Sequence, residues 1–533
     1  MHHRAPHSRI SRREFLLAST RAAGVFATAS LLTACGTTQA PPAASTAAPA
    51  AAPAPTSAAT ATAAPAPAAT SAVAAPAPTN APILAAPTAA VKAASGDIPG
   101  PEAAKIDWKQ FKGSQIRWIG GLHPISETLI KMAPEFEELT GIKTTVEQVD
   151  WSVYAQKEQL DLSNSNAQYD TYMAMYALDW QYGAAGLLAD LDQFINDPKL
   201  TDKEWLDLQD VSPGILSSAR WDGVAGHPSG TGKLYSIPYV IETYILGYRA
   251  DLFEKYNLKV PQTLDDVVPA AKAIAEGEKA SNMAGFAVRG SLDNAPITAV
   301  WMSLLPDYGG GDFDAKMHSR VGEDANVEFT DLLVNKILKP YGPVGWPGLS
   351  WDDLRHKFAN GAYGMVYDCD FFSLLYEDPA NSVIAGKLKY TNLGGPKGMG
   401  GSTFYFGNAI NNNSKNMGAA WLFNQWIVSK KVMRDFTAKY QNLIPTRLST
   451  WSDPSVQKMV NGWGGGTWIQ AVRNNLEKNV RLTLTPETEL TAVCTAWMGA
   501  NQKIYSGAPV KETLAAAAKQ IDDNMSKAGI LQS

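Results

Sequence analysis

The pattern of apolar and polar residues becomes regular at residue 115. Gln115-Ile116-Arg117-Trp118-Ile119 has the pattern of a short strand, and a turn with Gly120-Gly121 and His123-Pro124 follows it. A helical apolar stripe then begins after Ser126, its expected N-cap, and stops at Thr140-Gly141. Lys143 to Val149 predicts a second strand. Strand, helix and strand in this order indicate a βαβ unit of an α/β lobe, with ligand loops at the carboxyl ends of the strands.

The first 36 residues have the pattern of an export signal. A basic stretch with Arg12-Arg13 followed by Phe15-Leu16 precedes a modest apolar run that ends at Leu32. Paired arginines in this setting resemble a twin-arginine signal, and the run is too short and too polar to span a membrane well. Leu32-Thr33-Ala34-Cys35-Gly36 resembles the lipobox of bacterial lipoproteins. We therefore expect a signal peptide over residues 1–34 and lipid on Cys35 that anchors the protein to a membrane.

Residues 35–100 are predicted to form a disordered tether behind the lipidated cysteine. From Thr37 to Ser95 the chain is mostly Ala, Pro, Thr and Ser, and Lys92 is the only charged residue. Such a segment buries too little apolar surface to offset the entropy of ordering. The rest of the 533-residue chain is long enough for two lobes, each with its own core.

Charge and cysteine content narrow the class of protein. The formal net charge is −5 and the pI is about 5.9, which argues against nucleic acid as a partner. Cys369 and Cys494 are the only cysteines after Cys35, and we favour free, buried thiols over a disulfide between them.

Enzyme and metal motifs are missing after residue 100. That part contains no G-x-S-x-G, Walker, H-E-x-x-H or C-x-x-C pattern, and its glycine runs at 309–311 and 464–466 predict turns. Its histidines, at positions 123, 227, 318 and 356, show no ligand spacing, so we expect no metal and no cofactor. Asp368 and Asp370 follow a predicted strand. A pair of carboxylates can catalyse the cleavage of a glycoside. For these two residues we favour other roles, as hydrogen-bond acceptors for ligand hydroxyl groups or as a helix cap.

Several motifs occur in the order that is typical of one protein family. These are Pro134–Ile142, Tyr169-Asp170, Gly186–Asp192, Leu234–Tyr239, Tyr248–Tyr256, Pro261–Asp266, Phe358–Met365 and Asn413–Trp426. Across Ile116 to Arg447, the chain resembles the extracellular solute-binding proteins, family 1, of sugar-type ABC uptake transporters. The family fold implies α/β architecture of the periplasmic-binding-protein kind, type II-like, with two lobes around a hinged cleft. We expect the first lobe at 101–240 and 388–435, and the second at 241–387 and 436–533.

The resemblance also implies a function without catalysis. The protein is expected to capture a small polar solute by lobe closure and to deliver it to the permease subunits of an ABC transporter. A mono- or oligosaccharide is the favoured solute. The expected form is a monomer that is lipid-anchored to the outer face of the cytoplasmic membrane.

A sugar cleft needs flat aromatic faces and a few polar groups that meet the hydroxyls. Loop aromatics and carboxylates at predicted strand ends are the candidates, and the family pattern places most of them. Arg447 occupies the arginine position of a P-x-R motif that the family often has. The resemblance implies that this arginine either clamps the ligand or ties the lobes together. The predicted ligand-binding residues are Asp179, Trp180, Tyr239, Glu242, Trp301, Asp368, Asp370, Tyr405 and Arg447.

Other functions stay open from the sequence alone. A polyamine would suit several acids among aromatics, which Asp179, Glu242, Asp368 and Asp370 supply. A peptide or a metal ion is a further ligand class. Two alternatives remain. One is an exported carbohydrate-active enzyme on an α/β scaffold, and the other is a binding protein that acts as the partner of a sensor.

Overall fold

The computed structural model describes residues 98–531, except for 294, 400, 442–444 and 477–481. The predicted export signal with Arg12 and Arg13, the lipidation site Cys35 and nearly all of the tether lie outside the described residues. Within the described part, none of the helices combines the length and apolar character needed to cross a bilayer.

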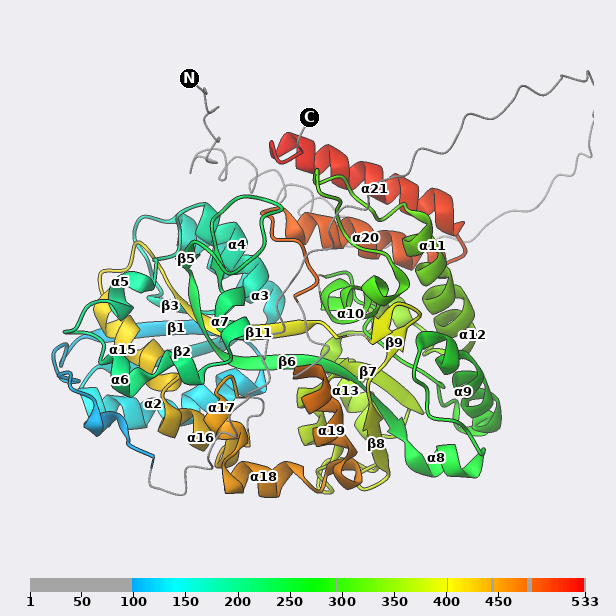
Figure 1. Ribbon diagram of the computed structural model, residues 1–533, viewed down its shortest axis with the longest axis horizontal. Helices are drawn as coiled ribbons and strands as arrows, with labels where there is room; N and C mark the ends of the chain where they lie inside the picture. Colours follow the sequence, from blue (N-terminus) through cyan, green and yellow to red (C-terminus); the bar gives the residue numbers. More distant parts are fainter. Residues whose placement is uncertain (1–97, 294, 400, 442–444, 477–481, 532–533) are drawn as a thin grey trace, which may run out of the picture. The chain divides into compact units, whose positions relative to one another are not determined.

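A seven-stranded sheet organises the described chain. Its strands follow the order β2-β1-β3-β11-β6-β7, and β8 also pairs with β6 (Figure 1). The strands are β1 Gln115–Gly121, β2 Lys143–Val149, β3 Thr171–Met175, β6 Ser236–Arg249, β7 Met365–Cys369, β8 Leu388–Thr391 and β11 Thr403–Ile410. Two small hairpins complete the β structure: β4 Arg220–Trp221 with β5 Lys233–Leu234, and β9 Gly394–Gly395 with β10 Gly398–Met399.

Helices fill the connections between these strands. Before β6 lie α2 Pro124–Thr140, α3 Trp151–Ser163, α4 Tyr176–Ala184, α5 Asp192–Ile195, α6 Lys203–Leu206 and α7 Pro213–Ser218. Between β6 and β11 lie α8 Ala250–Lys255, α9 Leu264–Gly277, α10 Met302–Leu304, α11 Asp324–Thr330, α12 Lys339–Tyr341, α13 Trp351–Ala359 and α14 Ser373–Tyr376. After β11 lie α15 Met417–Ile427, α16 Lys430–Ala438, α17 Leu448–Trp451, α18 Pro454–Val460, α19 Thr467–Asn474, α20 Leu490–Tyr505 and α21 Val510–Lys527. The 3-10 and π turns are η1 Pro101–Ala103, η2 Leu208–Asp210, η3 Lys279–Ser281, η4 Ile297–Trp301, η5 Leu305–Tyr308, η6 Asp331–Leu338, η7 Trp346–Gly348, η8 Asp370–Phe372 and η9 Trp463–Gly466.

The predicted βαβ unit is confirmed. β1 and β2 are parallel, with Gln115 opposite Lys143, and α2 connects them. The predicted cap at Ser126 is wrong, because α2 begins two residues earlier with Pro124 in its first turn. His123 takes the N-cap position, where its Nδ1 accepts a hydrogen bond from the Ile125 N–H at 3.2 Å. The Ser126 hydroxyl instead donates to the Gly121 carbonyl at 2.7 Å.

Strand β6 connects two lobes. All of its positions from Ser236 to Arg249 are buried. Its first half pairs antiparallel with β11, and its second half pairs antiparallel with β7 and β8. The elements around β1, β2, β3 and β11 are called the first lobe here, and those around β7 and β8 the second lobe. This is the two-lobed α/β fold that the sequence predicted.

The return of the chain to the first lobe lies between β8 and β11. The sequence predicts that the chain returns to the first lobe at Leu388, where β8 begins. In the structure, Leu388 pairs with Arg249 in the second half of β6, on the second-lobe side. β11 pairs with β3 and with the first half of β6. Strand pairing therefore places the crossover after Thr391, and the other lobe boundaries stay a prediction.

Arg447 ties three segments of the chain together. Its guanidinium donates to the carbonyls of Val428, Asp207 and Leu206, the latter two at 2.9 and 2.6 Å, and to the Asp210 carboxylate at 3.2 Å. The Arg447 side chain is fully buried. Most of its N–H groups are thus engaged by the protein itself. The partners lie before β6 and at the end of α15, so Arg447 ties segments of the first lobe to one another and not the two lobes. Contact between Arg447 and a ligand stays a prediction.

Replacing Arg447 tests this structural role. In Arg447→Ala, buried carbonyls and the Asp210 carboxylate lose their donor, so the free energy of unfolding should fall by about 3–5 kcal/mol. Urea denaturation measures this loss. Arg434→Ala is the control, because Arg434 is half-buried and pairs with its neighbour Asp435, and it should cost no more than about 1 kcal/mol. A loss in Arg447→Ala as small as in the control would contradict the role.

Candidate functional site

An aromatic cluster joins the lobes where the strand ends meet. From the first lobe, His123 follows β1, Trp151 begins α3 and Phe406 lies in β11. From the second lobe, Trp351 begins α13 and Phe371 lies in η8. The His123 ring lies 6.4 Å from Trp151, 5.2 Å from Phe406, 5.5 Å from Trp351 and 5.4 Å from Phe371, measured between ring centroids. These five residues are called the interlobe cluster below.

Glycine at the end of β1 makes room for one of these rings. A Cβ on Gly121 would lie 2.5 Å from the Trp151 indole carbons, a separation that no side chain tolerates. The Trp151 indole N–H donates to the Leu122 carbonyl at 3.1 Å. The Trp151 ring is therefore held directly against the carboxyl end of β1, where an α/β lobe presents its ligand loops.

A buried ion pair lies next to the cluster in the second lobe. Arg289 Nε donates to both Asp368 oxygens at 2.9 and 3.0 Å, and its NH2 group donates to Asp368 Oδ1. The side chains of Arg289 and Asp368 are 8% and 1% exposed, so the pair has little contact with water. The Arg289 guanidinium also lies 5.5 Å from the centre of the Phe372 ring. The pair presents a fixed cation beside a fixed acceptor.

Two more carboxyl groups lie near this ion pair. Burial raises the pKa of Glu242 to about 7 and the pKa of Asp370 to about 8. Asp370 accepts hydrogen bonds from the Thr243 N–H at 3.1 Å and from its hydroxyl at 2.9 Å. Each carboxyl group titrates near neutral pH, and each can therefore serve as either donor or acceptor to a hydroxyl group.

Asp179 and Tyr405 form a separate polar group in the first lobe. The Tyr405 hydroxyl donates to Asp179 Oδ2 at 2.9 Å, and the Ser236 hydroxyl donates to the same oxygen. Burial raises the pKa of Asp179 to about 7. The other Asp179 oxygen has no hydrogen-bond partner among the described residues.

The other predicted residues are packed in apolar surroundings. Trp180, Tyr239 and Trp301 are buried, and their N–H and O–H groups lack hydrogen-bond partners in the described part of the chain. Trp301 packs on Trp346, and Tyr239 packs on Phe436. The structure thus brings Glu242, Asp368 and Asp370 together around Arg289, and Asp179 together with Tyr405. Contact between any of the nine residues and a ligand stays a prediction.

Sequence reasoning left His123, Arg289 and Phe371 out of the candidate set. The sequence places His123 in the turn after β1 and gives it no metal-ligand spacing, although a position directly after the first strand is itself a signal for a site residue. Arg289 follows an extended segment that makes only isolated bridges, Ala284 to Tyr363 and Ala287 to Val366. The short apolar run before it, Phe286-Ala287-Val288, was the signal in the sequence.

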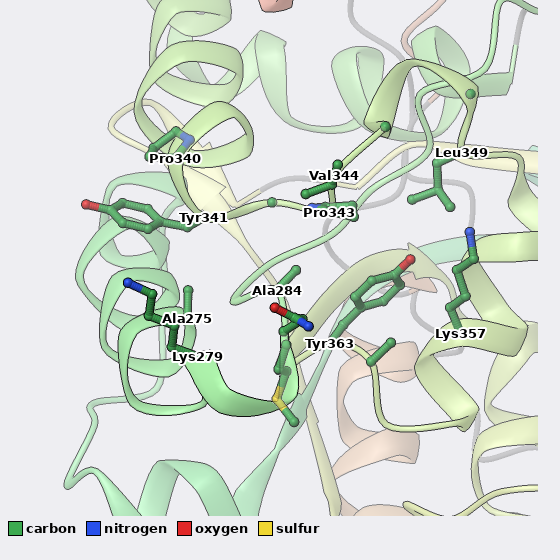
Figure 2. A pocket seen from close by; sticks show the side chains of 16 residues that line it. Ala275, Lys279, Ala284, Pro340, Tyr341, Pro343, Val344, Leu349, Lys357 and Tyr363 are labelled. Atoms are coloured by element: carbon green, nitrogen blue, oxygen red, sulfur yellow. The ribbon is translucent and has the colours of Figure 1, made fainter.

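A hollow in the second lobe lies away from these residues. It measures about 530 Å³ and is lined by parts of α9, the loop after α12, and Lys357 and Tyr363. Figure 2 shows Tyr341, Tyr363 and Lys357 around it. Its lining includes none of the nine predicted residues and none of the interlobe cluster. Size alone therefore does not identify it as the functional site.

Comparison with known proteins decides the family. The model of the bacterial extracellular solute-binding proteins matches residues 120–434. This chain belongs to that family. Members of this solute-binding protein family supply the substrate-binding component of ABC uptake transporters, so the predicted family, fold class and general function are confirmed.

Curated relatives include two proteins named for sugar alcohols. The erythritol/L-threitol-binding protein of Mycolicibacterium smegmatis is 28% identical over 420 residues, which cover 78% of this chain and 86% of the relative. The mannitol-binding protein of Pseudomonas aeruginosa is 25% identical over 57% of this chain and 66% of its own length.

Solved structures show the same fold at low identity. A solute-binding protein from Agrobacterium radiobacter K84, in complex with ribitol, superposes with a TM-score of 0.68 at 24% identity, over 78% of this chain and 99% of that one. A second, from Agrobacterium vitis S4 with bound D-mannitol, has a TM-score of 0.66 at 22% identity, over the same shares. These likenesses confirm the predicted solute-binding fold.

The raised pKa of Asp370 predicts a pH dependence of stability. A carboxyl group whose pKa rises on folding stabilises the fold below its unfolded pKa, near 4, and loses this contribution as pH rises towards 8. The free energy of unfolding should therefore fall from pH 5.5 to 7.0, and Asp370→Asn should remove about 2 kcal/mol of that fall. Urea denaturation at both pH values measures it.

The control for this experiment is Asp352→Asn, because the Asp352 side chain is 52% exposed. Its unfolding free energy should change with pH as in the unmodified protein. An equal pH dependence in Asp370→Asn and the unmodified protein would be evidence that Asp370 is ionised in the fold.

Proposed function

We propose that the protein captures an acyclic sugar alcohol or a small sugar between its lobes and delivers it to the permease of an ABC transporter. The observation that carries this proposal is the junction of the lobes, where the interlobe cluster lies beside the Arg289–Asp368 pair. Solute held there would contact both lobes at once and would stabilise the closed form.

The chemistry of the junction suits a neutral solute with many hydroxyl groups. Arg289 offers N–H donors, Asp368 offers acceptor oxygens, and Glu242 and Asp370 can do either. Trp151 and Trp351 line the junction with aromatic rings. Phe372 stacks on Trp351 and Arg355 lies over it, so the C–H groups of the solute would meet the remaining ring surface. A polyol presents donors, acceptors and C–H groups on every carbon, so each type of protein group finds a partner.

The names of the relatives support the choice of a sugar alcohol. One curated relative is named for erythritol and L-threitol and another for mannitol, and two structural neighbours carry ribitol and D-mannitol. The sequence alone favoured a mono- or oligosaccharide. Acyclic four- to six-carbon polyols are now the more specific choice within the same solute class.

The charges argue against the polyamine alternative. Asp368 is paired with Arg289, Asp370 accepts from Thr243, and one oxygen of Asp179 accepts from Ser236 and Tyr405. Burial raises the pKa of Asp179 and of Glu242 to about 7, so neither is fully ionised at neutral pH. A polyamine needs carboxylates that remain free to pair with its ammonium groups. The second cation near the cluster, Arg355, would further repel such a ligand.

Binding without turnover is part of the proposal. Asp368 is held by Arg289, so a glycosidase pair with Asp370 would lack a free nucleophile. The sequence further supports export by the twin-arginine signal at Arg12 and Arg13, lipid anchoring at Cys35 to the outer face of the cytoplasmic membrane, and a monomer that docks on permease subunits.

A thermal-shift screen tests the solute class. Erythritol, ribitol and D-mannitol should each raise the melting temperature of the purified protein in a saturable way. Maltose and putrescine are the comparison compounds. At about 100 times its dissociation constant, a solute that binds only the folded state adds about 2.7 kcal/mol. A shift with putrescine alone, or with maltose alone, would overturn the polyol proposal.

A Trp351→Ala variant tests whether the solute lies at the interlobe cluster. Loss of this second-lobe ring should weaken the binding of the best polyol about 5- to 30-fold in calorimetry, because the C–H groups of the solute lose their apolar face. Trp463→Ala is the matched control. Trp463 packs on Trp468, outside the cluster, and its removal should leave the dissociation constant unchanged. Equal affinities in all three proteins would place the solute elsewhere.

A further inference from the structure

His123 belongs to the first lobe but lies against the second. It is the N-cap of α2, and only 4% of its surface is exposed. Two of its ring contacts, Trp351 and Phe371, come from elements on the other side of the junction. Any opening of the lobes removes these two rings and admits water to the imidazole.

The hydrogen bond of His123 defines its protonation state in the closed form. Its Nδ1 accepts from the Ile125 N–H at 3.2 Å, so this nitrogen carries no hydrogen. A proton on Nδ1 would face the Ile125 N–H, and α2 would lose its cap. This cap lies within the first lobe, so it favours the neutral imidazole in any lobe arrangement. The contacts that depend on closure are those with Trp351 and Phe371 of the second lobe, which cover the ring.

The charges around His123 also favour the neutral ring. Arg355 of α13 and Arg289 both raise the cost of a positive charge there, while the partners from α3, β11 and η8 are uncharged rings. Burial, with smaller contributions from these two arginines, lowers the pKa of His123 to about 3. An imidazole exposed to water has a pKa near 6.5.

We propose that His123 couples lobe closure, and thereby solute binding, to pH: the lobes close on the solute only when the imidazole is neutral, and protonation favours the open form. The proposal rests on the proposed function of the junction as the solute site. It makes the protein a binder that holds its solute at neutral pH and releases it more readily in acid.

The sign of the effect distinguishes His123 from the nearby carboxyl groups. A group whose pKa falls on closure favours the closed form at high pH, and this contribution is lost as pH drops below the pKa of the open form. Glu242 and Asp370 have raised pKa values, so burying them on closure would strengthen binding as pH falls. Asp368 stays paired with Arg289. Weaker binding in acid therefore points to the histidine.

Calorimetry at two pH values tests the coupling. The probe is whichever of erythritol, ribitol and D-mannitol binds most tightly at pH 7.5. The dissociation constant of the unmodified protein should rise from pH 7.5 to 5.5, by up to about tenfold if opening of the lobes returns the imidazole to its ordinary pKa near 6.5. In His123→Asn it should not rise, because asparagine keeps an N-cap acceptor for α2 but does not titrate. His356→Asn, which removes an exposed histidine of α13, should keep the rise.

The coupling would be overturned if the unmodified protein binds the polyol equally well at both pH values. It would also be overturned if the His123→Asn variant still loses affinity at pH 5.5. If no polyol binds at any pH, the proposed solute class fails, and the same comparison at two pH values is made with whichever other solute of the thermal-shift screen binds. An equal dissociation constant for that solute at both pH values would overturn the coupling and not merely the solute class.

Discussion

The structure depends on one strand that belongs to both lobes. β6 is buried along its whole length, and its backbone groups are shared between β11 on the first-lobe side and β7 and β8 on the second-lobe side. Because backbone groups buried away from water must be paired, neither half of β6 can leave its sheet without a large cost. The lobes can therefore rotate about β6 and the neighbouring crossover but cannot separate.

This constraint explains where the polar groups of the site lie. Glu242 and Thr243 stand at the midpoint of β6, opposite Phe404 and Thr403 of β11. Thr243 also binds Asp370, which follows β7 in the second lobe. The point about which the lobes turn is thus also the point where carboxyl groups, the Arg289 cation and the aromatic rings converge. A solute placed there would contact groups of both lobes at once.

The fold could be predicted from the sequence better than the site. Strand and helix periodicity predicted β1, α2 and β2, and motifs in family order predicted the two lobes. The N-cap of α2 was missed because the choice between Ser126 and His123 depends on which backbone carbonyl and N–H groups are free. Arg447 looked like a candidate clamp because its carbonyl partners, far away in the chain, leave no mark in the sequence. Arg289 was missed for a similar reason, since only the folded chain brings it to Asp368.

The central claim is that solute binds at the lobe junction and not in the hollow beside Tyr341 and Tyr363. A crystal structure of the protein grown with erythritol tests it most directly. The account predicts solute density at the lobe junction, against the interlobe cluster, with hydroxyl groups on Arg289 and Asp368. Density in the hollow beside Tyr341 and Tyr363, with the junction empty, would contradict it.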